Sequence, residues 1–196
     1  LGYMHEQYQK VYHSLWDKEL QLFQSNTNQH SKIEKDKEKL FSAEENSFVF
    51  AGLALVISEF PSDWEHKKFY TDLFVQLAQT LKNTQRENGS WSSDLKGTKE
   101  VYQYSETAVG AYSTFGIAWG INNGVLDKKT YKSSIAKAWK AMSKEAVHPN
   151  GKLGYVQGTG KEPKDGQPVS YTSTPDFEDY GLGCFLLAGT EIYKLK

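Results

Sequence analysis

The chain has 196 residues, with 23 Lys and Arg against 24 Asp and Glu, so its formal net charge is −1. This balance lacks the basic surface that is typical of nucleic-acid-binding proteins. No apolar run approaches the ~20 residues that a helix needs to span a bilayer. We therefore expect one domain with neither nucleic acid nor a membrane as its partner. Cytoplasmic and secreted or periplasmic locations both remain open.

The aromatic content is high: Trp, Tyr and Phe together make up 14% of the chain. Aromatic rings pack in cores, and they also stack on the apolar faces of sugar rings. Both interpretations stay open for any single ring at this point. Cys184 is the only cysteine, and it is followed by the apolar run Phe185–Ala188. We expect it to be a buried thiol, and no internal disulfide is possible.

Two kinds of helix alternate along the chain. We expect amphipathic helices at 4–22, 62–86 and 128–146, and helices that are apolar on nearly all faces at 46–58, 106–122 and 178–193. A helix that is apolar all round is buried on all faces, whereas an amphipathic helix covers a core with one face. The order therefore predicts three αα-hairpins in which an outer layer surrounds an inner one. No segment alternates in the way that predicts a strand.

Carboxylates precede each expected inner helix: Glu44 and Glu45, then Glu106, then Asp176, Glu178 and Asp179. In a closed ring of hairpins the N-termini of all inner helices lie at the same end, so these acids would surround one mouth. Two explanations remain open. Acidic side chains favour helix N-termini for electrostatic reasons, and a helix N-terminus is also a site for anions such as a uronate.

Other candidate features are weaker. Asn88–Gly89 predicts a turn that presents Trp91, either as part of the core or as a platform for a sugar. The longest loop runs from His148 to Pro175, and long loops are often functional. Its Gly158–Gly160 segment lacks the strand and helix that a phosphate loop requires. The histidines, which are His5, His13, His30, His66 and His148, show no metal-ligand spacing, so we expect surface residues and no metal site.

Three stretches resemble a known family. Glu106–Gly124 is similar to the family's E-T-S-G-T-A-F followed by G-L-A-W-G-I-N-x-G. Gly151–Gln157 with Pro163 is similar to D-G-x-L-G-W-V-Q-P-I-G-x-x-P, and Tyr180–Glu191 is similar to Y-G-V-G-A-F-L-L-A-G-S-E. From about residue 41 to residue 196, the chain resembles glycoside hydrolase family 105, the unsaturated rhamnogalacturonyl hydrolases, and the related family 88 of unsaturated glucuronyl hydrolases.

This resemblance implies an all-α fold, the (α/α)6 six-hairpin toroid, in which residues 1–196 form the C-terminal half of a single barrel domain with about three hairpins. It implies hydrolysis of unsaturated uronyl-terminated oligosaccharides of the rhamnogalacturonan or pectin type, or of a related polyuronide. In the family an acid protonates the 4,5-double bond, water adds at C5, and rearrangement releases the next sugar. The usual catalytic Asp lies in the other half of the barrel, outside this chain. No cofactor is expected.

The chain departs from the family at a sugar-contacting motif, W-x-R-G-N-G-W. Here the first Trp is Ser42, the Arg is Glu44 and the last Trp is Phe48, while Asn46 is kept. The change from Arg to Glu reverses the charge that faces a uronate. The residues that we expect to contact the substrate are Glu44, Asn46, Phe48, Trp91, Glu106, Gln157 and Asp179.

These departures keep a second function open, namely a catalytically inactive carbohydrate-binding protein on the same scaffold. A helical interaction module is a third possibility. Three hairpins of a six-hairpin ring would also leave apolar flanks uncovered, and soluble proteins seldom expose large apolar patches. We therefore expect the flanks to be covered by the N-terminal half of the same barrel or by a second copy of the chain.

Overall fold

The computed structural model describes residues 1–25, 41–96, 107–156 and 179–195. In chain order its elements are α1 (Gly2–Leu15), β1 (Trp16–Asp17), β2 (Leu22–Phe23), α2 (Ala43–Glu59), α3 (Lys67–Thr84), α4 (Thr107–Asn122), α5 (Lys128–Ala141), the π-helical turn η1 (Met142–Ala146) and α6 (Asp179–Lys194). The only sheet in these ranges is the two-stranded pair β1–β2. No helix in the described part of the chain is long and apolar enough to cross a membrane.

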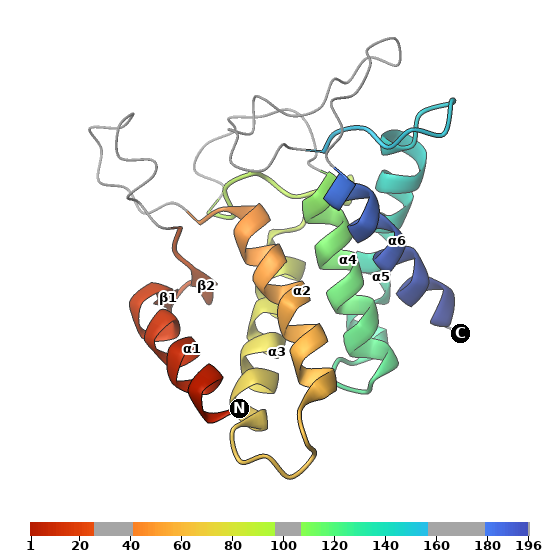
Figure 1. Ribbon diagram of the computed structural model, residues 1–196. Coiled ribbons are helices and arrows are strands. Elements are labelled where there is room, and N and C mark those ends of the chain that lie inside the picture. Colours follow the sequence, from red (N-terminus) through yellow and green to blue (C-terminus); the bar gives the residue numbers. More distant parts are fainter. Residues whose placement is uncertain (26–40, 97–106, 157–178, 196) are drawn as a thin grey trace, which may run out of the picture.

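The helices form two layers, as the alternation of patterns predicts (Figure 1). The central inner helix is α4, which packs between α2 and α6 and is buried along nearly its whole length. Of the outer helices, α3 packs on α2 and α4, and α5 packs on α4. The predicted inner helices agree with α2, α4 and α6 to within about three residues at each end, because burial on all faces leaves an unmistakable apolar run.

Glycine allows α2 and α4 to approach closely. A Cβ atom at Gly116 of α4 would overlap the ring of Phe50, which is fully buried on α2. That ring cannot easily move, because it stacks on Phe74 of α3 with 4.5 Å between ring centroids. The glycine therefore contributes to the inner layer by leaving room for a neighbouring aromatic ring.

The first helix is shorter than predicted. It ends at Leu15 rather than at residue 22, and the chain turns back in the β1–β2 pair. The Asp17 carboxylate accepts hydrogen bonds from the backbone N–H groups of Glu19 and Leu20, each at 3.1 Å, and Gln21 has a positive φ of 54°. These side-chain to backbone bonds offer the chain an alternative to another helical turn.

The start of α3 is also later than the predicted residue 62. Residues 61–66 form turns, in which Trp64 N–H donates to the Pro61 carbonyl at 3.2 Å. The turn packs the Trp64 ring on Phe60 and Tyr70, with centroids 4.5 and 5.7 Å away.

The helix predicted at 128–146 is also divided. Helix α5 ends at Ala141, and the π-helical turn η1 follows it.

Two histidines join α1 to the start of α3. The rings of His5 and His66 stack with centroids 3.8 Å apart and an angle of 8°. His5 Nδ1 also lies 3.1 Å from the hydroxyl of Tyr70. Partial burial and the neighbouring His66 lower the pKa of His5, and Glu65 opposes this shift. A proton on His5 is therefore less favourable in the folded chain than in the unfolded one.

This stack should make stability depend on pH in a defined direction. Because the folded-state pKa of His5 lies below its usual 6.5, the unfolded state binds the proton more readily. The contribution of His5 to the free energy of unfolding should be constant at pH values well above 6.5 and should decrease as the pH falls below 6.5. Unfolding midpoints measured between pH 8 and 5 check this, and His5→Phe should flatten the slope. His13→Phe, on an exposed position of α1, should keep it; an unchanged slope in His5→Phe would contradict the assignment.

Candidate functional site

The N-terminal ends of α2, α4 and α6 lie at the same end of the inner layer, as the sequence predicts for a mouth (Figure 1). We call this end the mouth. It carries Glu44 in the first turn of α2, and α6 begins at Asp179. Of the other predicted contacts, Glu106 and Gln157 lie outside the described residues. The mouth is therefore defined here mainly by α2 and by the first turns of α4 and α6.

Glu44 joins two inner helices at the mouth. The hydroxyl of Tyr180 on α6 donates to Oε1 of Glu44 at 3.4 Å. The carboxyl group is half-buried, and burial raises its pKa; Glu45 adds to this shift, whereas the Tyr180 hydrogen bond opposes it. The helix cap is a different residue, since the Ser42 side chain accepts from Glu45 N–H at 3.3 Å. Glu44 is thus not needed as a cap and keeps acceptor capacity at the mouth.

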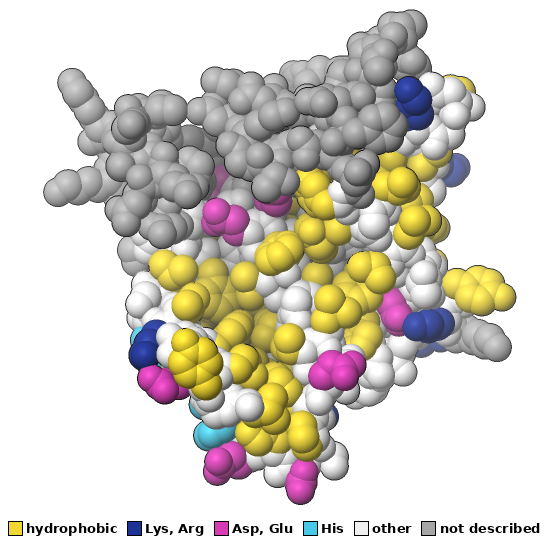
Figure 2. All heavy atoms as spheres, in the orientation of Figure 1, with side chains coloured by type: hydrophobic (Ala, Val, Ile, Leu, Met, Phe, Trp, Pro, Cys, Tyr) yellow, Lys and Arg dark blue, Asp and Glu magenta, His cyan; other side chains and the backbone are white. Residues whose placement is uncertain are grey.

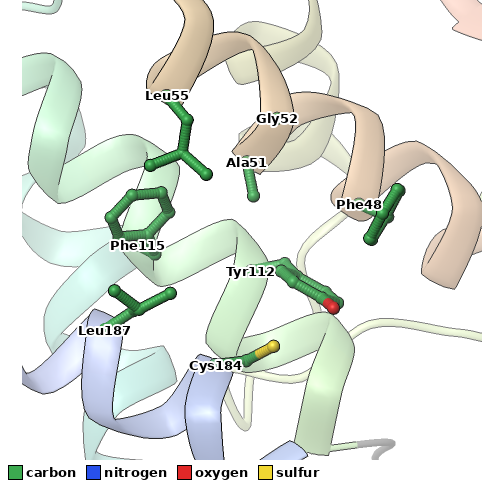
Figure 3. Close-up of a pocket in the computed structure, with 8 residues that line it drawn as sticks. All are labelled: Phe48, Ala51, Gly52, Leu55, Tyr112, Phe115, Cys184 and Leu187. Atoms are coloured by element: carbon green, nitrogen blue, oxygen red, sulfur yellow. The ribbon is translucent and has the colours of Figure 1, made fainter. Parts of the chain in front are cut away.

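An exposed aromatic edge lies one turn further along α2. Phe48 is 61% exposed, and its ring meets that of Tyr112 on α4 edge to face, with centroids 5.5 Å apart. Beside this pair is an apolar hollow of about 110 Å³ between α2, α4 and α6 (Figure 3). Its lining consists of Phe48, Ala51, Gly52, Leu55, Tyr112, Phe115, Cys184 and Leu187. Cys184 is buried, as predicted.

Asn46 has a structural role that the sequence did not indicate. Its side chain is fully buried, and its Oδ1 accepts from Phe23 N–H at 2.8 Å. Its Nδ2 donates to the carbonyls of Phe23 and Ser42, each at 2.9 Å. Two of these hydrogen bonds tie Phe23 of the β1–β2 pair to the start of α2, and the third joins Asn46 to the N-cap of its own helix. Asn46 supports the mouth from beneath and presents no polar atom to it.

Trp91 lies in the core. It is only 4% exposed, and its Nε1 donates to the Leu81 carbonyl near the end of α3 at 2.7 Å. The preceding turn forms as predicted, with Gly89 at a φ of 93° and Asn88 Oδ1 accepting from Ser90 N–H at 3.0 Å. Of the two interpretations of this ring, packing in the core accounts for its position and its hydrogen bond.

Among the described histidines, His148 departs most from the expected surface position. His148 is 5% exposed rather than on the surface, because Gly154 packs directly against its ring. In the ranges that the structure describes, no group of three or more His, Cys, Asp and Glu side chains is arranged to hold a metal ion.

The sequence profile of Glycosyl Hydrolase Family 88 matches residues 1–196. The chain belongs to glycosyl hydrolase family 88. From the sequence motifs we expected family 105 and gave family 88 as a related family. The family whose profile matches is family 88. The family 88 chain is 36% identical over 200 residues to the unsaturated 3S-rhamnoglycuronyl hydrolase of Formosa agariphila. That match covers 98% of this chain and 51% of the relative, so the chain spans about half the relative's length.

Solved structures support the same fold. A glycosyl hydrolase family 88 structure from Bacteroides vulgatus superposes with a TM-score of 0.83 at 28% identity, covering 97% of this chain and 55% of that one. A structure from Salmonella enterica, described as a possible member of family 105, gives a TM-score of 0.73 at 19% identity, covering 95% and 48%. The family 88 chain thus has the fold of the six-hairpin α/α toroids, to which its described helices contribute three hairpins.

Proposed function

We propose that the protein to which this family 88 chain belongs hydrolyses oligosaccharides that end in an unsaturated glycuronyl group linked to rhamnose. The observation that carries this proposal is the 36% identity, over 98% of the chain, to an unsaturated 3S-rhamnoglycuronyl hydrolase. The proposed substrate class is narrower than the rhamnogalacturonan, pectin or related polyuronide class that the resemblance implied.

The mouth has the groups that such a sugar requires. Phe48 and Tyr112 offer an apolar edge beside which a sugar ring can stack, and aromatic residues commonly contact sugars in this way. The nearby Glu44 carboxylate accepts hydrogen bonds and therefore suits sugar hydroxyl groups. A uronate would be repelled by Glu44, so we place the substrate carboxylate away from α2 and a neutral part of the substrate beside it.

The chemistry divides between two halves of the barrel. In the reaction implied by the family, an acid protonates the 4,5-double bond, water adds at C5, and the product rearranges to release the next sugar. We assign the acid to the part of the protein outside this chain and sugar positioning to the mouth. A positioning role still affects the rate strongly, because correct orientation supplies a large share of enzymatic acceleration.

The direct test is an assay of the whole protein on lyase-generated disaccharides with an unsaturated glycuronyl group linked to rhamnose or, for comparison, to another sugar. The double bond absorbs in the ultraviolet, so hydration appears as loss of absorbance. We expect turnover with preference for the rhamnose-linked substrate. Binding measured by calorimetry without loss of absorbance would instead support the inactive sugar-binding protein. If the protein neither binds nor turns over these disaccharides, both proposals are contradicted.

Phe48→Ala should lower kcat/KM of the whole protein by about two- to tenfold, because an aromatic contact is worth roughly 0.5–1.5 kcal/mol beyond its buried area. Its folding should be little affected, since the side chain is 61% exposed. Val75→Ala on α3 removes a 38% exposed apolar side chain away from the mouth and should leave kcat/KM unchanged. Equal rates in the two variants would remove Phe48 from the binding site.

A further inference from the structure

The outer helix α5 and the turn η1 carry a row of lysines on their solvent side. The buried side chains of α5 are those of Tyr131, Ser134, Ile135 and Ala138. Helical spacing places most of the exposed side chains of this segment on the opposite side. We call the lysines among them the lysine row, which consists of Lys129, Lys132, Lys137, Lys140 and Lys144. The row is roughly 20 Å long by the rise of an α-helix, so it can contact several units of an extended ligand.

The charge of the lysine row is not balanced locally. The only acids between residues 127 and 146 are Asp127 and Glu145, and Asp127 caps α5 by accepting from Thr130 N–H at 2.7 Å. No lysine of the row forms an ion pair with a residue that the structure describes. The outer helices α1 and α3, in contrast, each pair a lysine with an acid one turn away. The net charge of −1 for the whole chain thus conceals a local positive excess.

The lysine row reaches the mouth. At the start of η1, the sulfur of Met142 would lie only 3.0 Å from a Cβ atom at Gly110, which is in the first turn of α4. The η1 end of the row is therefore beside the start of α4. The first turn of α2 instead carries Glu44 and Glu45, and Figure 2 shows acidic side chains near this end of α2 and hydrophobic ones over the inner layer. Among the described residues, the outer side of α5 thus offers an anionic sugar chain a favourable surface next to the mouth.

We propose that the lysine row is a docking surface for a polyuronide strand, which keeps the protein beside the polymer from which its substrates are released. The positive surface is a property of the structure, whereas the choice of a polyuronide as its occupant rests on the proposed function. Each uronate carries one carboxylate, and the flexible lysine side chains can adapt to carboxylates spaced along a strand. A single exposed ion pair is weak, but a strand that spans the row forms several at once.

A polyuronide fits the lysine row better than nucleic acid does. Residues 127–146 contain lysine but no arginine. Phosphate recognition in nucleic acids favours arginine, because its planar guanidinium binds phosphate through two hydrogen bonds. Lysine contributes a point charge without that geometry, which suffices for carboxylates along a flexible sugar chain.

Affinity electrophoresis of the whole protein in gels that contain polygalacturonate tests this surface, with neutral dextran as the reference polymer. We expect retardation by polygalacturonate that decreases as salt is added, because salt screens exposed ion pairs. The row variant Lys132→Gln/Lys137→Gln/Lys140→Gln should bind polygalacturonate about five- to tenfold more weakly, since it loses three ion pairs. Lys132→Arg/Lys137→Arg/Lys140→Arg keeps the charge and should bind like the unmodified protein.

A control variant loses the same charge elsewhere. Lys10→Gln/Lys18→Gln/Lys68→Gln removes exposed lysines from α1, from the β1–β2 turn and from α3, and its affinity should stay within about twofold. Circular dichroism should show unchanged helical content in all variants, because every substituted side chain is exposed.

Three results would overturn the proposal: retardation by polygalacturonate no greater than by dextran, equal affinity of the row variant and the control variant, or tighter binding at the same salt concentration to duplex DNA or to vesicles of anionic phospholipid. The last result would assign the lysine row to a different class of partner. None of these measurements needs turnover. Docking without turnover would therefore contradict the proposed function alone, and turnover without docking would contradict this inference alone.

Discussion

Replacing Asn46 with Ala should lower the free energy of unfolding by about 3–5 kcal/mol. The change leaves the backbone N–H and carbonyl of Phe23 buried without their present partner, and each such group costs roughly 1–3 kcal/mol. It also removes a fully buried side chain and leaves a small cavity. The β1–β2 pair should separate from the start of α2, which would also loosen the mouth.

Urea unfolding followed by circular dichroism measures this loss. Asn46→Asp is the informative companion, because it keeps the size and the acceptor but cannot donate to the carbonyls of Phe23 and Ser42. It should remain strongly destabilised. Glu45→Ala, at an exposed position in the same turn, is the control and should change stability by less than about 0.5 kcal/mol. A loss below about 1 kcal/mol in Asn46→Ala would show that the amide does not hold the two segments together.

The second large effect is expected at Gly116. Gly116→Ala should destabilise the protein by about 2–3 kcal/mol, although alanine is the better helix former, because the new methyl group overlaps the Phe50 ring. That ring is held from the other side by Phe74. Thermal or urea unfolding of the single variant gives the cost directly.

A double-mutant cycle with Phe50→Leu identifies the cause. Leucine is smaller than phenylalanine and leaves space for the methyl group that Gly116→Ala introduces, so the double variant should lose less stability than the sum of the two single variants. Residues in contact commonly show coupling of roughly 0.5–3 kcal/mol. Strict additivity would mean that Gly116 matters for some reason other than its contact with Phe50.

The inner layer could be predicted from the sequence because burial on all faces is a property of each segment alone. The apolar runs with small residues therefore identified α2, α4 and α6 closely. The end of α1 could not be predicted in this way, because Leu20 and Leu22 continue the helical period past Leu15. After Leu15 the Asp17 carboxylate accepts hydrogen bonds from the backbone N–H groups of Glu19 and Leu20, and the pattern of hydrophobic residues gives no sign of these bonds.

The site was predictable only in part, for a related reason. Placing Glu44 at a shared mouth follows from the topology of hairpins, since the inner helices all run in the same direction. The bond from Tyr180 to Glu44 and the stack of His5 on His66 join residues that are distant in sequence, so no local pattern indicates them. The role of Asn46 was missed because its partners are backbone atoms, which are the same for every sequence.

A crystal structure of the whole protein with an unsaturated disaccharide bound tests the central claim most directly. We predict that the sugar lies at the mouth, with one ring against Phe48 and Tyr112, a hydroxyl group within hydrogen-bonding distance of the Glu44 carboxylate, and the uronate away from α2. A disaccharide bound elsewhere in the protein, or one whose uronate lies against Glu44, would contradict the account.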